Sequence, residues 1–285
     1  MSVFVRQQHT VCDFSSSDSW VILSPIEQSI KRKIEAVGTP LKDWDIQINY
    51  GIKTGYNEAF IITTEKRDEI LSNCKSEEER LRTAELIRPI LRGRDIKRYG
   101  YVDNGLYLIN THNGIRGRLP RIKIEDYPAI KTHLDKYWDK IEKRTDQGDT
   151  PYNLRNCAYL EDFYKPKILW KRVGSILRFG YNEDGALGLD STCFATGNNI
   201  EYLCGVLNSP MGHYLLKDSP KTGTGDLLIS VQAVEPIKVP QISQAENDTF
   251  KYYLDTNNEE EINRKVFELY DLSHNEKTYI NENFS

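Results

Sequence analysis

Helix-like and strand-like segments follow one another along this chain without regular alternation, and this order restricts its fold most. Within residues 24–44 the pattern predicts a short amphipathic helix that ends at Gly38 and Pro40, with Ser24 and Glu27 spaced as a capping box. Residues 44–63 then alternate and carry two glycines, which predicts two strands joined by a tight loop. Further helical patterns run from 66 to Pro89 and over 126–144, 199–217 and 259–273, and strand-like runs cover 97–114, 165–195 and 226–240. Because a doubly wound sheet requires regular strand–helix alternation, the order predicts an α+β fold.

Charge is distributed unevenly along the sequence. The formal net charge is -4, yet residues 80–178 contain 22 basic and 12 acidic side chains, whereas residues 245–285 contain 4 basic and 10 acidic ones. A region with such an excess of positive charge can bind a polyanion, and the acidic end cannot. We therefore expect the acidic end to pack away from any anion-binding surface.

Two basic segments account for much of this excess. Residues 80–98 hold seven lysines or arginines against two acids and are centred on Gly93. Residues 163–178 have no acid, and they combine cations with aromatic side chains: Phe163, Tyr164, Lys165, Lys167, Trp170, Lys171, Arg172 and Arg178. Lysine and arginine neutralise phosphates and release counterions, which favours nucleic acid as the partner. In the alternative interpretation these cations are solvated strand ends, and Ile168, Leu169 and Trp170 form core.

Motifs for catalysis or metal binding are missing from the sequence. It has no phosphate-loop, dinucleotide, zinc-protease or nucleophile-elbow motif. Its five cysteines, among them Cys12, are scattered, and its five histidines, among them His9, are not at metal-ligand spacing, so we expect neither disulfides nor a metal site. No apolar run suggests a membrane span or a signal peptide, which predicts a cytoplasmic location and no membrane partner.

One triplet resembles half of a nuclease centre. Asp95-Ile96-Lys97 supplies an Asp-x-Lys sequence, in which a carboxylate holds magnesium and the lysine orients the attacking water. The Pro-Asp pair that normally accompanies it does not occur in the sequence. We therefore expect Asp95 to orient a neighbouring arginine rather than bind metal.

Four longer blocks carry a family resemblance. They read YGIKTGYNEAFIIT (50–63), LIRPILRGRDIKRYGY (86–101), DQGDTPYNLRNCAYLEDFYKPKILWKRVG (146–174) and CGVLNSPMGHYLLK (204–217). In this order they resemble the TaqI-like C-terminal specificity domain, the target-recognition part of adenine-specific DNA methyltransferases and of type IIG restriction-methylation enzymes. The resemblance extends from about Trp20 to the final helix, so it covers nearly the whole chain.

The resemblance implies a fold and a domain organisation. The fold would be a mixed, irregular β-sheet target-recognition domain with flanking helices and a C-terminal helix. Residues 1–45 would be a linker and helix leading from a methyltransferase domain that this chain lacks, residues 46–240 the recognition domain, and residues 241–285 an acidic helical segment.

The resemblance also implies a function that depends on another catalytic domain. The chain would recognise a short sequence in double-stranded DNA and position it for methylation, without catalysis of its own. The S-adenosylmethionine loop and the Asn-Pro-Pro-Tyr motif of adenine methyltransferases do not occur here, so we expect no cofactor in this chain. The expected partners are DNA and a methyltransferase domain or subunit, with a nuclease domain as a further option.

Candidate DNA contacts follow from the same blocks and from the two basic segments. Gly51 and Gly55 would present a loop tip, the arginines beside Gly93 would project toward a phosphate or base edge, and residues 221–226 would form a basic loop. For Tyr56 a packing role is an open alternative, and residues 207–217 resemble a scaffold helix. The candidates are Lys53, Thr54, Tyr56, Asn57, Arg92, Arg94, Lys97, Arg98, Arg155, Lys171, Arg172, Arg178, Lys221, Thr222 and Thr224.

Two other functions remain open at this point. One is an autonomous magnesium-dependent nuclease that uses Asp95 and Lys97. The other is a protein-interaction module of a phage-defence system, whose basic surface has no role in binding DNA.

Overall fold

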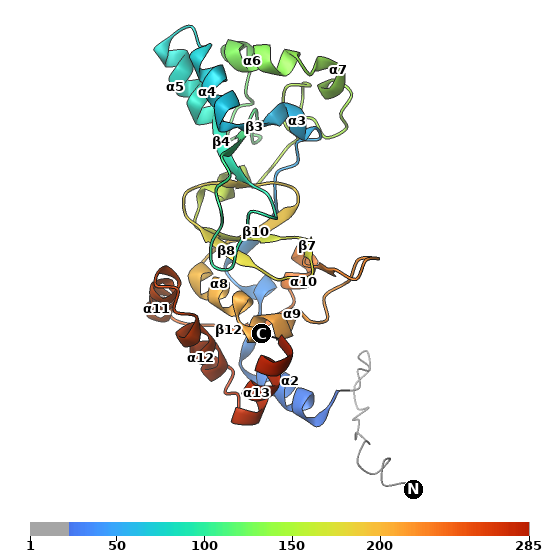
Figure 1. The fold of residues 1–285 in the computed structure, drawn as a ribbon, viewed down its shortest axis with the longest axis vertical. Coiled ribbons are helices and arrows are strands. Elements are labelled where there is room, and N and C mark those ends of the chain that lie inside the picture. Colours follow the sequence, from blue (N-terminus) through green and yellow to red (C-terminus); the bar gives the residue numbers. More distant parts are fainter. Residues whose placement is uncertain (1–22, 285) are drawn as a thin grey trace.

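The computed structural model describes residues 23–284. The start of the expected linker over 1–45, with His9 and Cys12, lies outside the described residues. The described chain is elongated, with helices gathered at both ends and a β-sheet across the middle (Figure 1). We call the end formed mainly by residues 53–164 the upper part, and the end formed mainly by residues 24–43 and 199–284 the lower part. Helices and several small sheets are mixed, which confirms the predicted α+β fold.

The central sheet separates two hydrophobic cores. Its strands are antiparallel and lie in the order β2 (Ile46–Tyr50), β10 (Thr192–Gly197), β6 (Lys167–Lys171) and β8 (Phe179–Asn182). Side chains alternate between the two faces of a strand, so Ile168 and Trp170 join the core of the lower part while Leu169 joins that of the upper part. Because both faces are covered, the residues of β6 do not alternate between buried and exposed: Lys167 to Trp170 are all buried, and Lys171 at the end is exposed.

The upper part contains a second sheet and short helices. Its strands lie in the order β3 (Ile61–Thr63), β5 (Leu106–Ile109), β4 (Ile87–Leu91) and β9 (Leu187–Gly188), and only the β4–β9 pair is parallel. The helices are α3 (Asn57–Phe60), α4 (Thr64–Ser72), α5 (Glu77–Leu86), α6 (Pro128–Asp135) and α7 (Trp138–Ile141), with 3-10 turns η2 (Ile124–Asp126) and η3 (Leu160–Tyr164). Long loops connect these elements.

The lower part is mostly helical. Its helices are α2 (Pro25–Val37), α8 (Ile200–Asn208), α9 (Pro210–Leu216), α10 (Val231–Val234), α11 (Gln244–Asp255), α12 (Glu259–Leu269) and α13 (His274–Phe284), with the 3-10 turn η1 (Leu41–Asp43). Two small ribbons pair β1 (Gly38–Pro40) with β12 (Lys238–Pro240), and β7 (Val173–Gly174) with β11 (Leu227–Leu228). The predicted capping box of α2 is present, since the backbone N–H of Ser24 donates to Glu27 Oε2 at 3.0 Å. Helices α8 and α9 are almost fully buried, and the predicted scaffold helix over 207–217 corresponds to the end of α8 and all of α9.

Three sequence-based expectations about local structure are wrong. The strands expected over 44–63 do not form a hairpin, because β2 pairs with β10, β3 pairs with β5, and α3 lies between them. The helix expected up to Pro89 ends at Leu86, and Pro89 lies inside β4. The strand expected over 226–240 is interrupted by the helix α10, which lies between two short strands. The first two errors concern pairing with strands that are distant in sequence, which local patterns do not reveal.

A buried ion pair connects the two ends of the lower part. Glu276 of α13 accepts hydrogen bonds from Lys33 Nζ (2.8 Å) and from the backbone N–H of Ser273 (2.7 Å), and its side chain is 4% exposed. Burial opposes ionisation of the carboxyl group, but these hydrogen bonds outweigh it and lower the pKa of Glu276 from 4.5 to about 2. Because this pKa is lower in the folded state, the stabilisation is complete above pH 4.5 and is lost as the pH falls toward 2.

We therefore expect Glu276→Gln to lower the free energy of unfolding at pH 7 by roughly 1–3 kcal/mol. The difference from wild type should shrink as the pH approaches 2, because protonation then removes the same charge from the wild-type side chain. Urea denaturation at pH 7 and at several acidic pH values measures this, with Glu282→Gln on the exposed side of α13 as the control. A pH-independent difference would contradict the prediction.

Candidate nucleic-acid interface

The two basic segments meet at Ser191, just before β10. The backbone N–H of Gly93 donates to Ser191 Oγ (3.2 Å), and the backbone N–H of Arg172 donates to the Ser191 carbonyl oxygen (3.0 Å). Gly93 also lies against Lys171, because a Cβ atom added to Gly93 would come within 2.6 Å of Lys171 Cγ. A larger residue at position 93 would push the segments apart. The structure thus places the two basic segments side by side.

Asp95 is buried and holds Arg92. The Nε and Nη2 atoms of Arg92 each donate to one carboxylate oxygen at 2.9 Å, and Asn104 Nδ2 and the backbone N–H of Arg92 donate to the same carboxylate. Burial disfavours the charged form, but the hydrogen bonds from Arg92 outweigh it and lower the pKa of Asp95. The expectation that Asp95 orients an arginine is confirmed.

The other cations of the first segment have different surroundings. Arg94 is exposed, and no carboxylate of residues 23–284 lies within ion-pair distance of it. Lys97 Nζ donates to the carbonyl oxygen of Arg94 (3.2 Å). Arg98 forms an ion pair with Glu259 of α12 and donates to the carbonyl oxygen of Asn208 (2.7 Å). The expectation that the acidic end packs away from the basic segments is therefore wrong at Arg98, whose guanidinium is already engaged.

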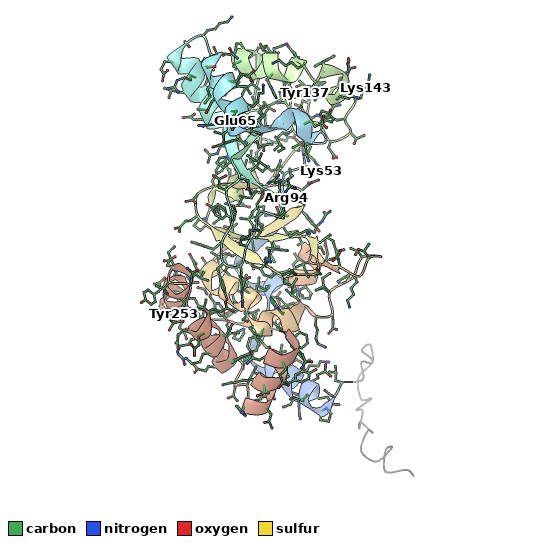
Figure 2. The ribbon with its side chains drawn as sticks, viewed as in Figure 1. Lys53, Glu65, Arg94, Tyr137, Lys143 and Tyr253 are labelled. Atoms are coloured by element: carbon green, nitrogen blue, oxygen red, sulfur yellow. The ribbon has the colours of Figure 1, made fainter. Side chains whose placement is uncertain are left out.

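Cations from three chain segments line one cleft, which we call the basic cleft. It has a volume of about 560 Å³, and Lys53, Arg155 and Arg172 lie along it. Asp146 accepts from both Lys53 (2.8 Å) and Arg155 (3.1 Å), and the hydrogen bond from Lys53 lowers the pKa of the Asp146 carboxyl group. Figure 2 shows Lys53 and Arg94 at the narrow middle of the molecule, between the upper helices and the central sheet. A phosphate in the cleft would compete with Asp146 for two cations.

Glycines shape the loop that carries Lys53. A Cβ atom on Gly51 would lie 2.0 Å from the carbonyl oxygen of Leu189, so the chain passes β9 at a distance that only glycine allows. Gly55 has a positive φ of 71°, which glycine adopts without strain. The loop is therefore shaped as expected, but Thr54 is only 2% exposed and its hydroxyl donates to Asn57 Oδ1. A DNA contact by the Thr54 side chain is incompatible with this burial.

Asn57 and Tyr56 complete this loop. Asn57 is exposed, as a contact would require. Tyr56 is half-buried, its hydroxyl donates to Glu58 (2.6 Å), and its ring lies 6.2 Å from that of Tyr137. This geometry favours the packing alternative for Tyr56.

The second basic segment divides into core and surface. Trp170 and Phe163 are buried, and so is Lys167, whose Nζ donates to Phe163 O and Asn182 Oδ1 at 2.7 Å. Burial lowers the pKa of Lys167 to about 8. The alternative interpretation is thus correct in placing Ile168, Leu169 and Trp170 in the core, but it is wrong for Lys167, which is buried rather than solvated. At the other end of β6, Lys171 is exposed.

The remaining predicted contacts lie around β7 and β11. Arg178 is exposed in the loop between β7 and β8, and Lys221 is exposed where the chain turns toward β11. In that turn Thr224 Oγ1 lies 2.9 Å from Thr222 Oγ1 and donates to Asp226 (3.2 Å). Since β7 follows Arg172 directly and pairs with β11, the base of this turn lies next to the segment that brings Arg172 into the basic cleft.

Sequence reasoning missed Arg144, which joins the two loops behind the basic cleft. Its guanidinium is buried and donates to the carbonyl oxygens of four residues: Thr54, Asp146 (2.9 Å), Pro151 (3.0 Å) and Asn153. It also lies 4.4 Å from the ring centroid of Phe60. Burial lowers the pKa of Arg144 to about 10. A lone arginine in the stretch EKRTDQGDT carries no sequence signal for this role.

Two further properties concern residues 23–284 as a whole. No helix in this range is both long and apolar enough to span a bilayer. Nor does this range bring three or more histidine, cysteine, aspartate or glutamate side chains together in a way that would hold a metal ion.

A model of the TaqI-like C-terminal specificity domain family matches residues 88–230, half of the chain. The chain belongs to this family. The matched range contains the second basic segment, residues 88–98 of the first, and three of the four strands of the central sheet of this TaqI-like specificity domain. A search of curated proteins found no match.

Solved structures of two restriction enzymes share the fold of this TaqI-like domain. The type IIL restriction-modification enzyme MmeI in complex with DNA aligns over 87% of this chain with a TM-score of 0.59 and 10% identity. The type IIG restriction endonuclease BpuSI aligns over 91% with a TM-score of 0.51 and 13% identity. The alignments cover 36% and 32% of those chains, so this domain spans about a third of each enzyme.

Proposed function

We propose that this TaqI-like specificity domain recognises a short sequence in double-stranded DNA for a restriction-modification enzyme. The observation that carries the proposal is the convergence of Lys53, Arg94, Arg155, Lys171 and Arg172 from separate segments around Ser191 and the basic cleft. Such a surface neutralises phosphates, and exposed arginines beside it can read base edges. The DNA complex of the structurally similar MmeI supports the same partner.

The finer assignment follows the family resemblance. We propose that the associated catalytic domain is an adenine-specific methyltransferase, alone or fused to a nuclease, that binds S-adenosylmethionine and acts in the cytoplasm in phage defence. The domain described here would orient the DNA for that enzyme. The cofactor loop and the Asn-Pro-Pro-Tyr motif do not occur in these 285 residues, so no chemical step is assigned to them.

The competing nuclease interpretation has less support from the geometry. The Asp95 carboxylate is occupied by four donors from Arg92 and Asn104, and Lys97 Nζ donates to a backbone carbonyl oxygen. If the chain were a protein-interaction module that does not bind DNA, the cations that converge on this surface would have no role. Selection from a pool of random-sequence duplexes distinguishes these alternatives. A recognition domain should bind duplex DNA and enrich one sequence from the pool without cutting it.

Replacing Arg94 and Lys171 together by glutamine should weaken duplex binding and lower the slope of log K against log salt by about 1–2, because each phosphate contact contributes a slope of about 0.9. Fluorescence anisotropy between low and moderate salt measures both quantities. The matched control removes two lysines of the lower part, the exposed Lys31 and the partly exposed Lys265, and so gives the same change in net charge. Equal effects in the two double variants would remove Arg94 and Lys171 from the interface.

A further inference from the structure

An arginine-rich loop lies beside the basic cleft. Residues 113–121, between β5 and η2, carry Arg116, Arg118 and Arg121, and all three side chains are exposed. We call this segment the arginine loop. It lines a second cleft of about 820 Å³ together with Asp149 and residues 156–158. None of its residues is among the candidate contacts that sequence analysis selected.

The arginine loop has a defined shape. Ile115 pairs with Leu119 across the turn, and Gly114 has a φ of 74° where a Cβ atom would come within 2.4 Å of the carbonyl oxygen of Leu119. Gly117 at the tip has a φ of 77°, and an added Cβ atom would meet nothing within 4 Å. The base of the loop is therefore closely packed, and its tip projects into solvent.

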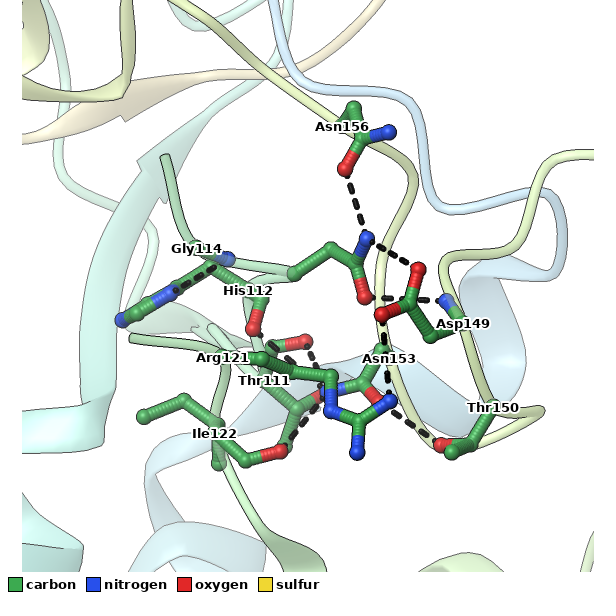
Figure 3. A network of polar contacts seen from close by, with 10 residues as sticks. Thr111, His112, Gly114, Arg121, Ile122, Asp149, Thr150, Asn153 and Asn156 are labelled. Atoms are coloured by element: carbon green, nitrogen blue, oxygen red, sulfur yellow. Dashed lines mark hydrogen bonds and ion pairs between the residues drawn. The ribbon is translucent and has the colours of Figure 1, made fainter. Parts of the chain in front are cut away.

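A polar network holds the base of the loop in place (Figure 3). Asn113 Nδ2 donates to Asp149 Oδ1 (2.9 Å) and to Asn156 Oδ1 (2.6 Å), and Asn113 Oδ1 accepts from the backbone N–H of Asp149 (2.9 Å). Arg121 donates to the other oxygen of Asp149 (3.1 Å). The loop is thus fixed to the segment that leads into Arg155, which belongs to the basic cleft.

The two clefts adjoin. Asn156, Cys157 and Ala158 line both of them, so the arginine loop continues the surface formed by Lys53, Arg155 and Arg172. The three arginines of the loop differ in whether they form an ion pair. Arg118 is paired with Glu161 and Arg121 with Asp149, whereas no carboxylate of the described chain lies within ion-pair distance of Arg116.

We infer that the arginine loop is a second DNA-contacting element, which binds the sugar-phosphate backbone next to the stretch held by the basic cleft. This inference rests on the proposed function, because it extends the same DNA surface. Because the base of the loop is already fixed, its backbone loses little conformational freedom when the arginines bind phosphate. Contacts to the backbone would lengthen the bound stretch of duplex and fix its direction across the domain.

The test compares Arg116→Gln/Arg118→Gln with a control, Lys140→Gln/Lys143→Gln, which removes two exposed lysines elsewhere in the upper part. We expect the salt slope of duplex binding to fall by about 1–2 in the arginine variant and to stay unchanged in the control. On duplexes of increasing length, wild-type affinity should continue to rise beyond the length at which the affinity of the arginine variant levels off. Thermal unfolding verifies that both variants are folded.

Three results would overturn the inference. If wild type binds duplex and the arginine variant keeps its slope and length dependence, the inference fails while the proposed function stands. If the arginine variant prefers a different DNA sequence but keeps the wild-type salt slope, the loop contacts bases and not the backbone, and the inference is wrong. If wild type itself binds no duplex, the proposed function fails, and the inference fails with it.

Discussion

Glutamine in place of Lys53, Arg155 and Arg172 together is expected to weaken duplex binding roughly 100- to 1,000-fold at moderate salt, because three charge-assisted contacts are lost. The salt slope should fall by about 2–3, since each neutralised phosphate contributes about 0.9. All three side chains line the basic cleft, so their effects should be larger than those of scattered surface cations. The measurement is a salt titration of a labelled duplex.

The control for this triple variant has the same net charge as the variant, but its three substitutions lie outside the basic cleft. In the lower part, Lys31 and Lys42 are exposed and Lys265 is partly exposed, and replacing the three by glutamine removes the same number of charges. If attraction between the whole protein and DNA were the cause, both triple variants would lose affinity equally. A loss confined to the cleft variant assigns the binding to that surface. Substitutions on the surface should change the free energy of unfolding by only about 0.5 kcal/mol each.

The fold class was predictable because it depends on the order of local patterns. Amphipathic periodicity located α2 and its capping box, and the missing alternation of strands and helices pointed to an α+β fold. Pairing of β2 with β10 was not predictable in the same way, because register between strands some 150 residues apart depends on tertiary packing. The predicted hairpin failed for this reason.

The candidate site was predictable where charge and glycine coincide. Gly93 between Arg92 and Arg94, and Gly51 before Lys53, marked positions where the backbone passes close to other chain segments. Burial was harder to read from sequence. Lys167 has the same residue type as Lys171 four positions later, yet it lies at the covered end of β6.

The arginine loop was missed although its sequence carries a signal. The stretch NGIRGRLPR combines two glycines and a proline with three arginines, which is typical of an exposed basic turn. Cations were counted over longer segments, and Glu125 and Asp126 a few residues later offset part of the positive charge of this stretch. Arg144 is a different case, since its partners are backbone carbonyl oxygens that leave no trace in the sequence.

Arg144→Met is expected to lower the free energy of unfolding by about 2–4 kcal/mol, because it leaves several buried carbonyl oxygens without donors. Arg144→Lys should restore only part of this loss, since one ammonium group cannot reach acceptors on both loops as the planar guanidinium does. Both variants should also weaken duplex binding, because the Asp146 backbone that Arg144 holds positions the carboxylate shared by Lys53 and Arg155.

Thermal and urea unfolding of Arg144→Met and Arg144→Lys, with Lys143→Met as the control, separate this effect from a loss of surface charge. Lys143 is the adjacent residue and its side chain is 74% exposed, so its replacement should leave stability nearly unchanged. Duplex binding is then measured well below the melting temperature of each variant, where the protein is folded. If Arg144→Met unfolds like wild type but binds DNA weakly, Arg144 contacts DNA itself and its structural role is wrong. If it is destabilised and binds weakly while Lys143→Met does neither, the loops behind the basic cleft depend on Arg144.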